Sequence, residues 1–528
     1  SNGQSQPSGR NDEPARPPEG GAVTDLVLGD QLTWRRGPVA ADPDEPVLLI
    51  ESTSFAERHP YHPHKLTLVF SAMRHFRDAL RERGRTVWYR QCETFEDGIA
   101  AHLSAHPGDD LVAMRPASHG AGDRLRDLVT AHGGSLELVD NDLFLCAPAT
   151  FDDWAADRSE FTHEAFYRFM RRRTGYLMDG DDPIGGQWNY DEENRETPPA
   201  GYDPPSPPRF EPDALTRETE AWVAETFDGG YEEPPYGGAW ANPEPFRWPV
   251  ARAEALTALD AFVTDRLPEF GPYQDAMVEG EWALDHALLS PALNLWLLHP
   301  GEVVEAAIER VDDPEVPRNS LEGFVRQVLG WREFMRHVYR VGMPDLVEAN
   351  RLGATAALPE CYWTGDTDMA CLADAVEGVR KRGYSHHIQR LMVLSNFALL
   401  YGVEPRELNR WFHAAYVDAS HWVTTPNVIE MGLFAGDLFA TKPYAASANY
   451  VDRMSDYCDG CAYDPDETVG EGACPFNALY WEFLDRNEDD LRENHRMGLV
   501  YHHLDDKDRE PIRERAAAVR ERARDGEL

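Results

Sequence analysis

The chain has 528 residues and a formal net charge of −42, from 93 acidic and 51 basic side chains. This length suffices for two or three domains, each with a core of its own. It contains no apolar run of about 18 residues, which excludes a transmembrane helix, and residues 1–20 lack the apolar segment of a secretory signal. Seven cysteines without such a signal favour a reducing cytoplasm.

The charge is extreme, and only four of the basic residues are lysines: Lys65, Lys381, Lys442 and Lys507. Dense surface carboxylates are typical of a halophilic protein, which they keep hydrated while high salt screens their repulsion. The alternative is an acidic protein that avoids nucleic acid. Molar salt also weakens attraction to phosphate, so net charge does not exclude a DNA partner, which would then need a local arginine-lined groove.

In chain order, residues 1–21 are expected to form a disordered tail and residues 22–150 an α/β domain. Short apolar runs alternate there with amphipathic stretches, which predicts a parallel sheet covered on both faces. The dinucleotide fingerprint G-x-G-x-x-G is absent. A ligand could still lie at the strand ends near Gly29, Asp30 and Gln31, or this could be a plain turn. Strands are expected at 25–30, 47–51, 86–92, 110–114 and 136–146, and helices at 66–84 and 121–132.

Residues 151–250 are expected to be an interdomain crossover, which is rich in Pro, Gly and acidic residues from 180 onward and carries a short helix near 213–226. Residues 251–512 have helical periodicity. Ser320 is expected to be the N-cap of a long helix, and the apolar helix 386–402 is expected to end at Gly402. Residues 513–528 are expected to be a solvated terminal helix.

Four cysteines suggest a metal site. Cys458, Cys461 and Cys474 have the spacing Cys-x2-Cys-x12-Cys, and Cys371 lies upstream in TGDTDMAC. Thiolates grouped in this way bind zinc or an iron–sulfur cluster. A zinc ribbon more often uses two Cys-x2-Cys pairs, whereas a Cys-Pro sequence ends the ligand run of many four-iron clusters, so both alternatives stay open from spacing alone.

His386, His387 and Arg390 form a polar group on an otherwise apolar helix, where their spacing lets all three point the same way. Two histidines beside an arginine offer a proton donor and a binding site for an anion. The alternative is a set of satisfied core residues. Trp363 and Trp411 are ordinary core candidates unless a redox cofactor lies near them.

Ten ordered segments across residues 22–510 resemble the iron–sulfur bacterial cryptochromes and photolyases, also called prokaryotic (6-4) photolyases. They are LVLGDQL (26–32), SAMRHF (71–76), GGQWNYDEENR (185–195), FGPYQDAM (270–277), LLSPALNLWLL (288–298), EGFVRQVLGWREFMR (322–336), YWTGDTDMAC (362–371), HHIQRLMVLSNFALL (386–400), TKPYAASANYVDRMSDYCDGC (441–461) and ACPFNALYWEF (473–483).

The resemblance implies a Rossmann-like α/β domain, then an all-helical domain that binds FAD and a [4Fe–4S] cluster. It assigns the cluster to Cys371, Cys458, Cys461 and Cys474 and so favours iron–sulfur over zinc. It also implies a ribityllumazine antenna near Gly29, Asp30, Gln31 and Glu57, although the loop 51–64 is longer than usual. The implied flavin contacts are Tyr273, His286, Ser290, Asn294, Glu322, Gln327, Arg332, Asn396, Asp418 and Asn427.

Two positions depart from the family pattern, because Thr424 stands where a Glu near the flavin is expected and Phe412 where relatives have Tyr. Trp363 and Trp411 remain for electron transfer. The implied function is light-driven repair of UV-damaged DNA, with the (6-4) lesion ranked first as substrate. It places His386, His387 and Arg390 at the lesion. Arg380, Lys381 and Arg382 are candidate phosphate contacts or a solvated helix start. The alternatives are a signalling cryptochrome without repair and a light-independent iron–sulfur DNA-binding protein.

Overall fold

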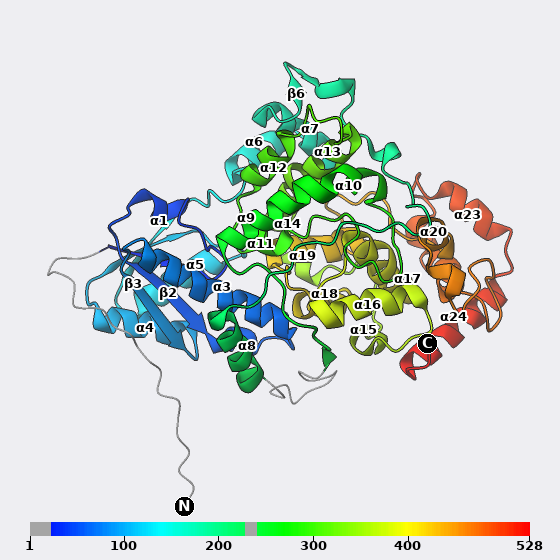
Figure 1. Ribbon diagram of the computed structural model, residues 1–528. Coiled ribbons are helices and arrows are strands. Elements are labelled where there is room, and N and C mark those ends of the chain that lie inside the picture. The colour runs from blue at the N-terminus through cyan, green and yellow to red at the C-terminus, as the bar shows by residue number, and fades with distance from the viewer. Residues whose placement is uncertain (1–22, 228–239) are drawn as a thin grey trace, which may run out of the picture.

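A computed structural model describes residues 23–227 and 240–528, so the predicted tail at 1–21 lies outside the described residues. The N-terminal region is a parallel five-stranded sheet in the order β3-β2-β1-β4-β5 (Figure 1). This confirms the predicted α/β architecture. The strands are β1 (Val23–Val27), β2 (Val47–Ser52), β3 (Val87–Cys92), β4 (Asp110–Met114) and β5 (Ser135–Val139).

Helices cover both faces of the sheet because the central strands are apolar on both sides. Leu48 and Ile50 of β2 pack toward one helical layer, whereas Val47 and Leu49 of the same strand join the opposite cluster. The helices of this region are α1 (Gly37–Ala41), α2 (Thr53–Ala56), α3 (Pro63–Glu82), α4 (Phe95–Ala105) and α5 (Ala121–Ala131).

Two predicted strands are shorter than expected at their carboxyl ends. The first strand ends at Val27, and residues 28–31 turn toward β4. The last strand ends at Val139 rather than continuing to 146, because the Asn141 side chain closes a turn by accepting the Leu143 N–H and donating to the Arg115 carbonyl.

The crossover is more ordered than expected. Helices α6 (Pro148–Ala155) and α7 (His163–Thr174) precede a two-stranded ribbon, β6 (Met178–Asp179) and β7 (Asp182–Pro183). Phe166, Tyr167 and Met170 of α7 are buried in the main core, so this helix packs with the helical region. The predicted short helix is confirmed as α8 (Ala214–Phe227), which lies along α3 (Figure 1).

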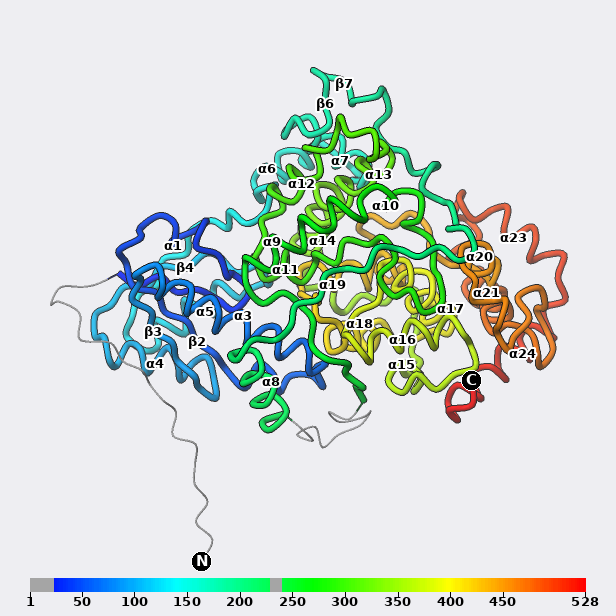
Figure 2. The backbone as a smooth tube through the Cα atoms, viewed as in Figure 1, coloured from blue at the N-terminus to red at the C-terminus, as the bar shows by residue number. Residues whose placement is uncertain are grey.

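The remainder of the chain is helical, as predicted, and forms the larger body that runs from green to red in Figure 2. No helix among residues 23–227 and 240–528 is long and apolar enough to cross a membrane. The helices are α9 (Arg252–Ala261), α10 (Leu267–Tyr273), α11 (Ser290–Asn294), α12 (Pro300–Ile308), α13 (Arg318–Val325), α14 (Glu333–Gly342), α15 (Cys361–Thr364), α16 (Ala370–Arg382), α17 (Asn396–Tyr401), α18 (Pro405–Ala415), α19 (His421–Pro426), α20 (Ala448–Met454), α21 (Pro475–Arg486), α22 (Glu488–Leu491), α23 (Gly498–Asp505) and α24 (Arg509–Arg524).

Two helix predictions need correction. The helix expected to start at Ser320 begins at Arg318, and the Ser320 hydroxyl instead bonds the Gly271 N–H and the Pro268 carbonyl of another segment. The terminal helix α24 is not solvated on all sides, because Ile512, Ala516 and Val519 are buried against α21. Arg515 of α24 also donates to the Ala473 carbonyl at 2.9 Å.

Four helical stretches contain π-helical turns, a local widening that often marks functional sites. Three of these turns carry residues predicted to be in the site: Gln327 and Arg332 lie in Arg326–Arg332, Arg390 in Gln389–Ser395 and Asn427 in Asn427–Gly432. The fourth is Phe262–Arg266.

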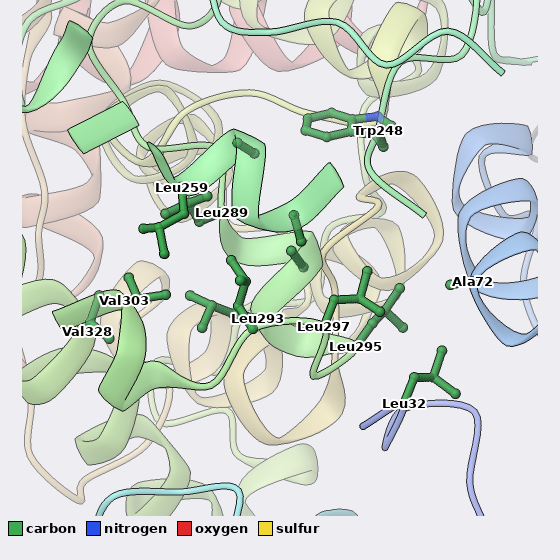
Figure 3. Packing of buried hydrophobic residues seen from close by; sticks show 14 of the residues in the cluster. Leu32, Ala72, Trp248, Leu259, Leu289, Leu293, Leu295, Leu297, Val303 and Val328 are labelled. Atoms are coloured by element: carbon green, nitrogen blue, oxygen red, sulfur yellow. The ribbon is translucent and has the colours of Figure 1, made fainter. Parts of the chain in front are cut away.

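One apolar cluster joins the two regions. Leu32 and Ala72 from the α/β region lie across from Leu295 and Leu297 of the helical region (Figure 3). The Leu32 N–H also donates to the Leu295 carbonyl at 3.1 Å. The carboxyl edge of the sheet therefore faces the helical body, which positions the predicted antenna residues next to it.

Candidate functional site

The predicted catalytic residues begin the helix 387–401, in which the π-helical turn Gln389–Ser395 runs into α17. His386 is fully buried and its ring stacks on that of His286, with centroids 4.5 Å apart. Neither ring nitrogen of His386 has a hydrogen-bond partner among the described residues, nor has Nε2 of His286. His387 differs because its side chain is exposed to solvent.

Arg390 is held by protein groups rather than left open for an anion, which corrects its predicted role. Its guanidinium donates to both carboxylate oxygens of Asp418, at 3.1 and 3.0 Å, and to the Ser385 carbonyl at 2.7 Å. The guanidinium also lies over the Tyr416 ring, 4.2 Å from its centroid. A bidentate pair of this kind has a fixed geometry.

The electrostatics keep the three histidines neutral at pH 7. Burial, with smaller contributions from the neighbouring His387 and Arg390, lowers the pKa of His286 to about 3. Burial and Arg390 lower the pKa of His387 to about 4, and burial holds the pKa of His386 well below its usual range. Because the His387 side chain is accessible to solvent, a bound ligand could reach it.

Four of the predicted flavin contacts form one group, which consists of Asp418, Ser290, Asn294 and His286. The Ser290 hydroxyl donates to Asp418 Oδ2 at 2.6 Å, and the Asn294 amide donates to the Asp418 carbonyl at 2.7 Å. His286 joins this group through its contact with His386. Arg390 holds the pKa of Asp418 below its usual range in spite of burial, so Asp418 is a carboxylate at pH 7.

Arg332 lies between the rings of Trp296, Trp422 and Phe144, with its guanidinium 4.7, 4.9 and 5.5 Å from their centroids. Its Nη2 donates to the Leu293 carbonyl at 3.4 Å, whereas Nε and Nη1 have no hydrogen-bond partner in the described part of the chain. Burial lowers its pKa to about 10. Nη1 lies 3.7 Å from Glu333 Oε1 as an ion pair, so the buried Nε–H group remains for a ligand acceptor.

The other predicted flavin contacts occupy separate surroundings. Glu322 accepts the Tyr190 N–H at 3.1 Å and pairs with Arg326, while Gln327 donates to the Gly323 carbonyl of its own helix. The amide groups of Asn396 and Asn427 bond to residues 446 and 423, and the Tyr273 ring packs on Tyr202 at 5.1 Å. Each of these side chains has a hydrogen-bond or ring partner within the protein.

The predicted electron-transfer tryptophans are both buried in one apolar cluster. Trp411 contacts Tyr362 at 5.2 Å and Trp363 contacts Trp240 at 5.2 Å between ring centroids. Phe412 stacks on Tyr416 at 4.9 Å, so a hydroxylated ring lies directly beside the position where the resemblance leads us to expect a tyrosine. The Thr424 hydroxyl accepts the Ser420 N–H at 3.1 Å.

The four predicted cluster ligands, Cys371, Cys458, Cys461 and Cys474, line one cavity. Tyr457, Tyr463 and Phe476 line its walls, which are almost entirely apolar. Cys371 lies in the first turn of α16 and Cys474 precedes α21, so both lie at helix N-termini, where a negative charge is favoured. Cys361 is buried outside this cavity.

The four thiols that share this cavity are a donor set for a metal centre. Thiolates around one tetrahedral zinc, with bonds of about 2.3 Å, must nearly touch one another. Among residues 23–227 and 240–528, no group of three or more His, Cys, Asp or Glu side chains could hold one metal ion. Burial raises the pKa of Cys458 and Cys474 to about 12, so a cationic centre is needed to stabilise their thiolates.

The predicted antenna residues follow β1 and β2. Gly29, Asp30 and Gln31 lie where the strand order reverses between β1 and β4, the usual ligand position in such sheets. The Gln31 amide donates to the Met114 carbonyl at the end of β4 at 3.2 Å. Burial raises the pKa of Asp30, and Glu57 is exposed after α2.

Sequence reasoning missed Lys65. Its ammonium donates to the His413 and Ala419 carbonyls at 2.8 and 3.1 Å, and burial lowers its pKa to about 7. Its charge also helps to keep Asp418 ionised. The available signal was a lysine inside the apolar stretch KLTLVF, in a chain with only four lysines.

The candidate phosphate contacts are engaged within the protein. Arg382 pairs with Glu244 and lies over the Trp282 ring at 4.5 Å, and Lys381 pairs with Glu377 at 2.8 Å. Arg380 donates to the Trp240 carbonyl at 3.0 Å. The run forms the last turn of α16 and not a solvated helix start, so that expectation is wrong.

The family model described as deoxyribodipyrimidine photo-lyase-related protein matches residues 25–233. A (6-4) photolyase of Agrobacterium fabrum is 40% identical over 489 residues, which cover 90% of this chain and 94% of that protein. The chain belongs to the deoxyribodipyrimidine photo-lyase-related family.

Solved structures agree with the fold of this photolyase-related chain. A bacterial class III photolyase from Agrobacterium tumefaciens matches with a TM-score of 0.57 at 16% identity, covering 97% of this chain and 98% of that one. A cryptochrome of Synechocystis matches with a TM-score of 0.53 at 15% identity, covering 82% and 88%. Both likenesses support the architecture of an α/β region followed by a helical region.

Proposed function

We propose that this chain is a light-driven enzyme that repairs UV photoproducts of pyrimidines in DNA, with the (6-4) lesion as its first substrate. The observation that carries the proposal is the 40% identity to a (6-4) photolyase over 90% of the chain. The neutral, solvent-accessible His387 beside the charged pair Arg390–Asp418 supports it, because lesion repair needs a proton donor next to a polar binding site.

FAD is the proposed cofactor, and when reduced and excited it supplies one electron to the lesion. Ser290, Asn294 and Asp418 offer hydroxyl, amide and carboxylate groups for its polar chain, and Arg332 offers an Nε–H donor for a phosphate or ring oxygen. Tyr273, Glu322, Gln327, Asn396 and Asn427 are assigned lesser roles, since protein contacts already engage them. Trp411 and Trp363 would conduct electrons to the flavin site.

His387 is the proposed proton donor to the lesion. A damaged nucleotide flipped out of the duplex would approach it from the solvent side, and the phosphates of the DNA would raise its low pKa toward neutrality. His386, which is fully buried, would support it by packing against His286. Arg390 would orient Asp418 rather than bind the lesion.

We further propose that Cys371, Cys458, Cys461 and Cys474 bind a [4Fe–4S] cluster, supported by their shared apolar cavity. A ribityllumazine antenna is proposed at Gly29, Asp30, Gln31 and Glu57, supported by the position of the first three at the reversal of strand order. Halophily and a cytoplasmic location remain proposals from the charge of −42 and the sequence.

The deciding experiment measures repair of an oligonucleotide with one (6-4) photoproduct, in 2 M KCl, with chemically reduced protein. Blue light should restore the intact bases, and a dark control should not. A cyclobutane-dimer oligonucleotide tests lesion preference in parallel. If flavin and iron are present and neither lesion is repaired in light, repair is refuted and the departures Thr424 and Phe412 favour a signalling cryptochrome.

A further inference from the structure

A chain of hydrogen bonds joins the segment 455–474, which carries Cys458, Cys461 and Cys474, to the helix that carries His387. The Tyr457 hydroxyl donates to Asp374 Oδ2 at 2.6 Å, and the Gln389 amide nitrogen donates to the Tyr457 hydroxyl at 3.0 Å. The amide oxygen of Gln389 accepts the backbone N–H of His386 at 3.1 Å. We call this group of three residues, Tyr457, Asp374 and Gln389, the relay.

The direction of every bond in the relay is fixed by the available donors. The Asp374 carboxylate can only accept, and its Oδ1 also accepts the Gly280 N–H at 3.3 Å. Tyr457 must therefore donate to Asp374 and accept from the Gln389 NH2 group. This in turn directs the Gln389 oxygen to the His386 N–H, so the amide has one satisfied orientation.

The Gln389 contact is one half of a capping box. The helix begins at residue 387, which makes His386 the N-cap and Gln389 the third helical residue, whose side chain reaches back to the N-cap N–H. Tyr457 and Gln389 are 1% and 2% exposed, so water does not compete for these bonds. The relay thus fixes the first turn, and with it His387 and Arg390.

The other end of the relay lies next to two of the cysteines. Tyr457 immediately precedes Cys458 and lines the cysteine cavity, and Asp374 lies one helical turn after Cys371 on α16. The Gln389 amide nitrogen donates to the Tyr457 hydroxyl and also, at 3.5 Å, to Asp374 Oδ2. Both acceptors therefore lie on segments whose cysteines a bound centre would fix in place.

We propose that the relay couples the cysteine-bound centre to the repair site, with Tyr457, Asp374 and Gln389 acting as positioning residues for His387. The proposal rests on the proposed repair function. It gives the cysteine centre a role in lesion chemistry: the filled centre holds the proton donor in place without touching the DNA.

The test compares Tyr457→Phe with Tyr501→Phe. Tyr501 is an equally buried tyrosine whose hydroxyl donates to the Leu484 carbonyl at 2.9 Å, far along the chain from the relay, so both variants lose a buried hydroxyl. The measurements are repair per absorbed photon at saturating (6-4) oligonucleotide, affinity for that oligonucleotide in the dark, iron and flavin per chain, and hydrogen exchange of residues 384–391.

We expect Tyr457→Phe to keep its iron and flavin, to bind lesion DNA within threefold of the native chain, and to lose about tenfold in repair per photon, because misplacing a catalytic group weakens chemistry more than binding. Exchange at 384–391 should become several-fold faster. Tyr501→Phe should match the native chain in repair and in the exchange of this segment.

Gln389→Met keeps the side-chain length without the amide and lies away from the cysteines, so it tests the relay if Tyr457→Phe loses iron. Because both act through one chain of bonds, the double variant should fall no further than either single variant. Native repair by Gln389→Met with full iron and flavin overturns the proposal. A native chain that repairs nothing refutes the proposed function instead, while unchanged exchange at 384–391 in both variants refutes the relay.

Discussion

His387 combines two properties that a proton donor to a bound lesion needs, namely access for the substrate and a pKa that the substrate itself can raise. Its side chain is exposed to solvent, and desolvation by the surrounding protein together with Arg390 lowers its pKa to about 4. His387→Ala should reduce repair per photon about 100-fold, the size expected for losing a general acid. Flavin and iron content should not change.

The matched control for this variant is His503→Ala, an exposed histidine on α23. It should repair the lesion at the native rate. Repair by His387→Ala within twofold of the native value would remove His387 from the mechanism.

His337 is buried away from the site and gives a pH prediction with a definite sign. Its ring stacks on Phe151 at 4.4 Å and its Nε2–H donates to the Cys146 carbonyl, and burial followed by Arg340 and Arg336 lowers its pKa to about 3. The unfolded histidine titrates near its usual value of about 6.5. Below that pH the unfolded chain takes up a proton that the folded chain refuses, so acid reduces the free energy of unfolding.

His337→Gln keeps a donor for the Cys146 carbonyl but removes this titration. The native chain should therefore lose stability relative to the variant as pH falls from 7.5 to 5, by up to about 1.4 kcal/mol per pH unit below 6.5. Denaturant unfolding at constant salt measures the difference. A difference that stays constant with pH would show that His337 is not held neutral.

At the level of elements, the pair Arg390–Asp418 ties the π-helical turn Gln389–Ser395 to the segment between α18 and α19. Asp418 is 7% exposed and Arg390 22%, so removing the carboxylate leaves a largely buried cation. Asp418→Asn should lower the free energy of unfolding by about 3 kcal/mol at pH 7. Glu348→Gln, which breaks the exposed pair Arg406–Glu348, should cost less than about 1 kcal/mol. Equal losses would show that the Asp418 pair is no more important than a surface contact.

Local patterns predicted most elements but few of the contacts between them. The five strands and the helix ending at Gly402 follow from apolar periodicity and a glycine at positive φ. Ser320 failed as an N-cap because its hydroxyl serves Gly271, 49 residues away. The same limit applies to the site: His386, His387 and Arg390 stood out on one helix, whereas the partner Asp418 and the relay residue Tyr457 come from distant segments that no spacing rule connects.

The segment 455–474 between α20 and α21 carries three of the four cysteines, and the fourth lies on α16, so the stability of this segment should depend on the bound centre. Cys458→Ala should lose iron, the broad visible absorption of a cluster and most of the soluble yield, because metal binding and folding are coupled at such sites. Cys361→Ala is the matched control, since Cys361 is 4% exposed and lies outside the cavity. Normal iron content in Cys458→Ala would show that the ligand assignment is wrong.

For the whole molecule, the balance between attraction and repulsion of charges decides how salt acts. The chain has 93 acidic and 51 basic residues, so a large excess of carboxylates has no cationic partner. Exposed ion pairs such as Arg492–Asp505 contribute little to stability, and salt weakens them. Repulsion among the unpaired carboxylates is summed over the whole surface, and salt weakens it as well.

Because negative charges are in excess, the weakening of repulsion by salt outweighs the weakening of the ion pairs. The screening length falls from about 10 Å at 0.1 M to about 3 Å at 1 M salt, which is shorter than the spacing of most surface charges. The thermal unfolding midpoint should therefore rise clearly between 0.1 and 2 M KCl. An equal osmotic concentration of sucrose stabilises without screening, so it should reproduce only part of the rise. A midpoint that is unchanged or lower in 2 M KCl would refute adaptation to high salt, and the acidic surface would then serve to keep non-specific nucleic acid away.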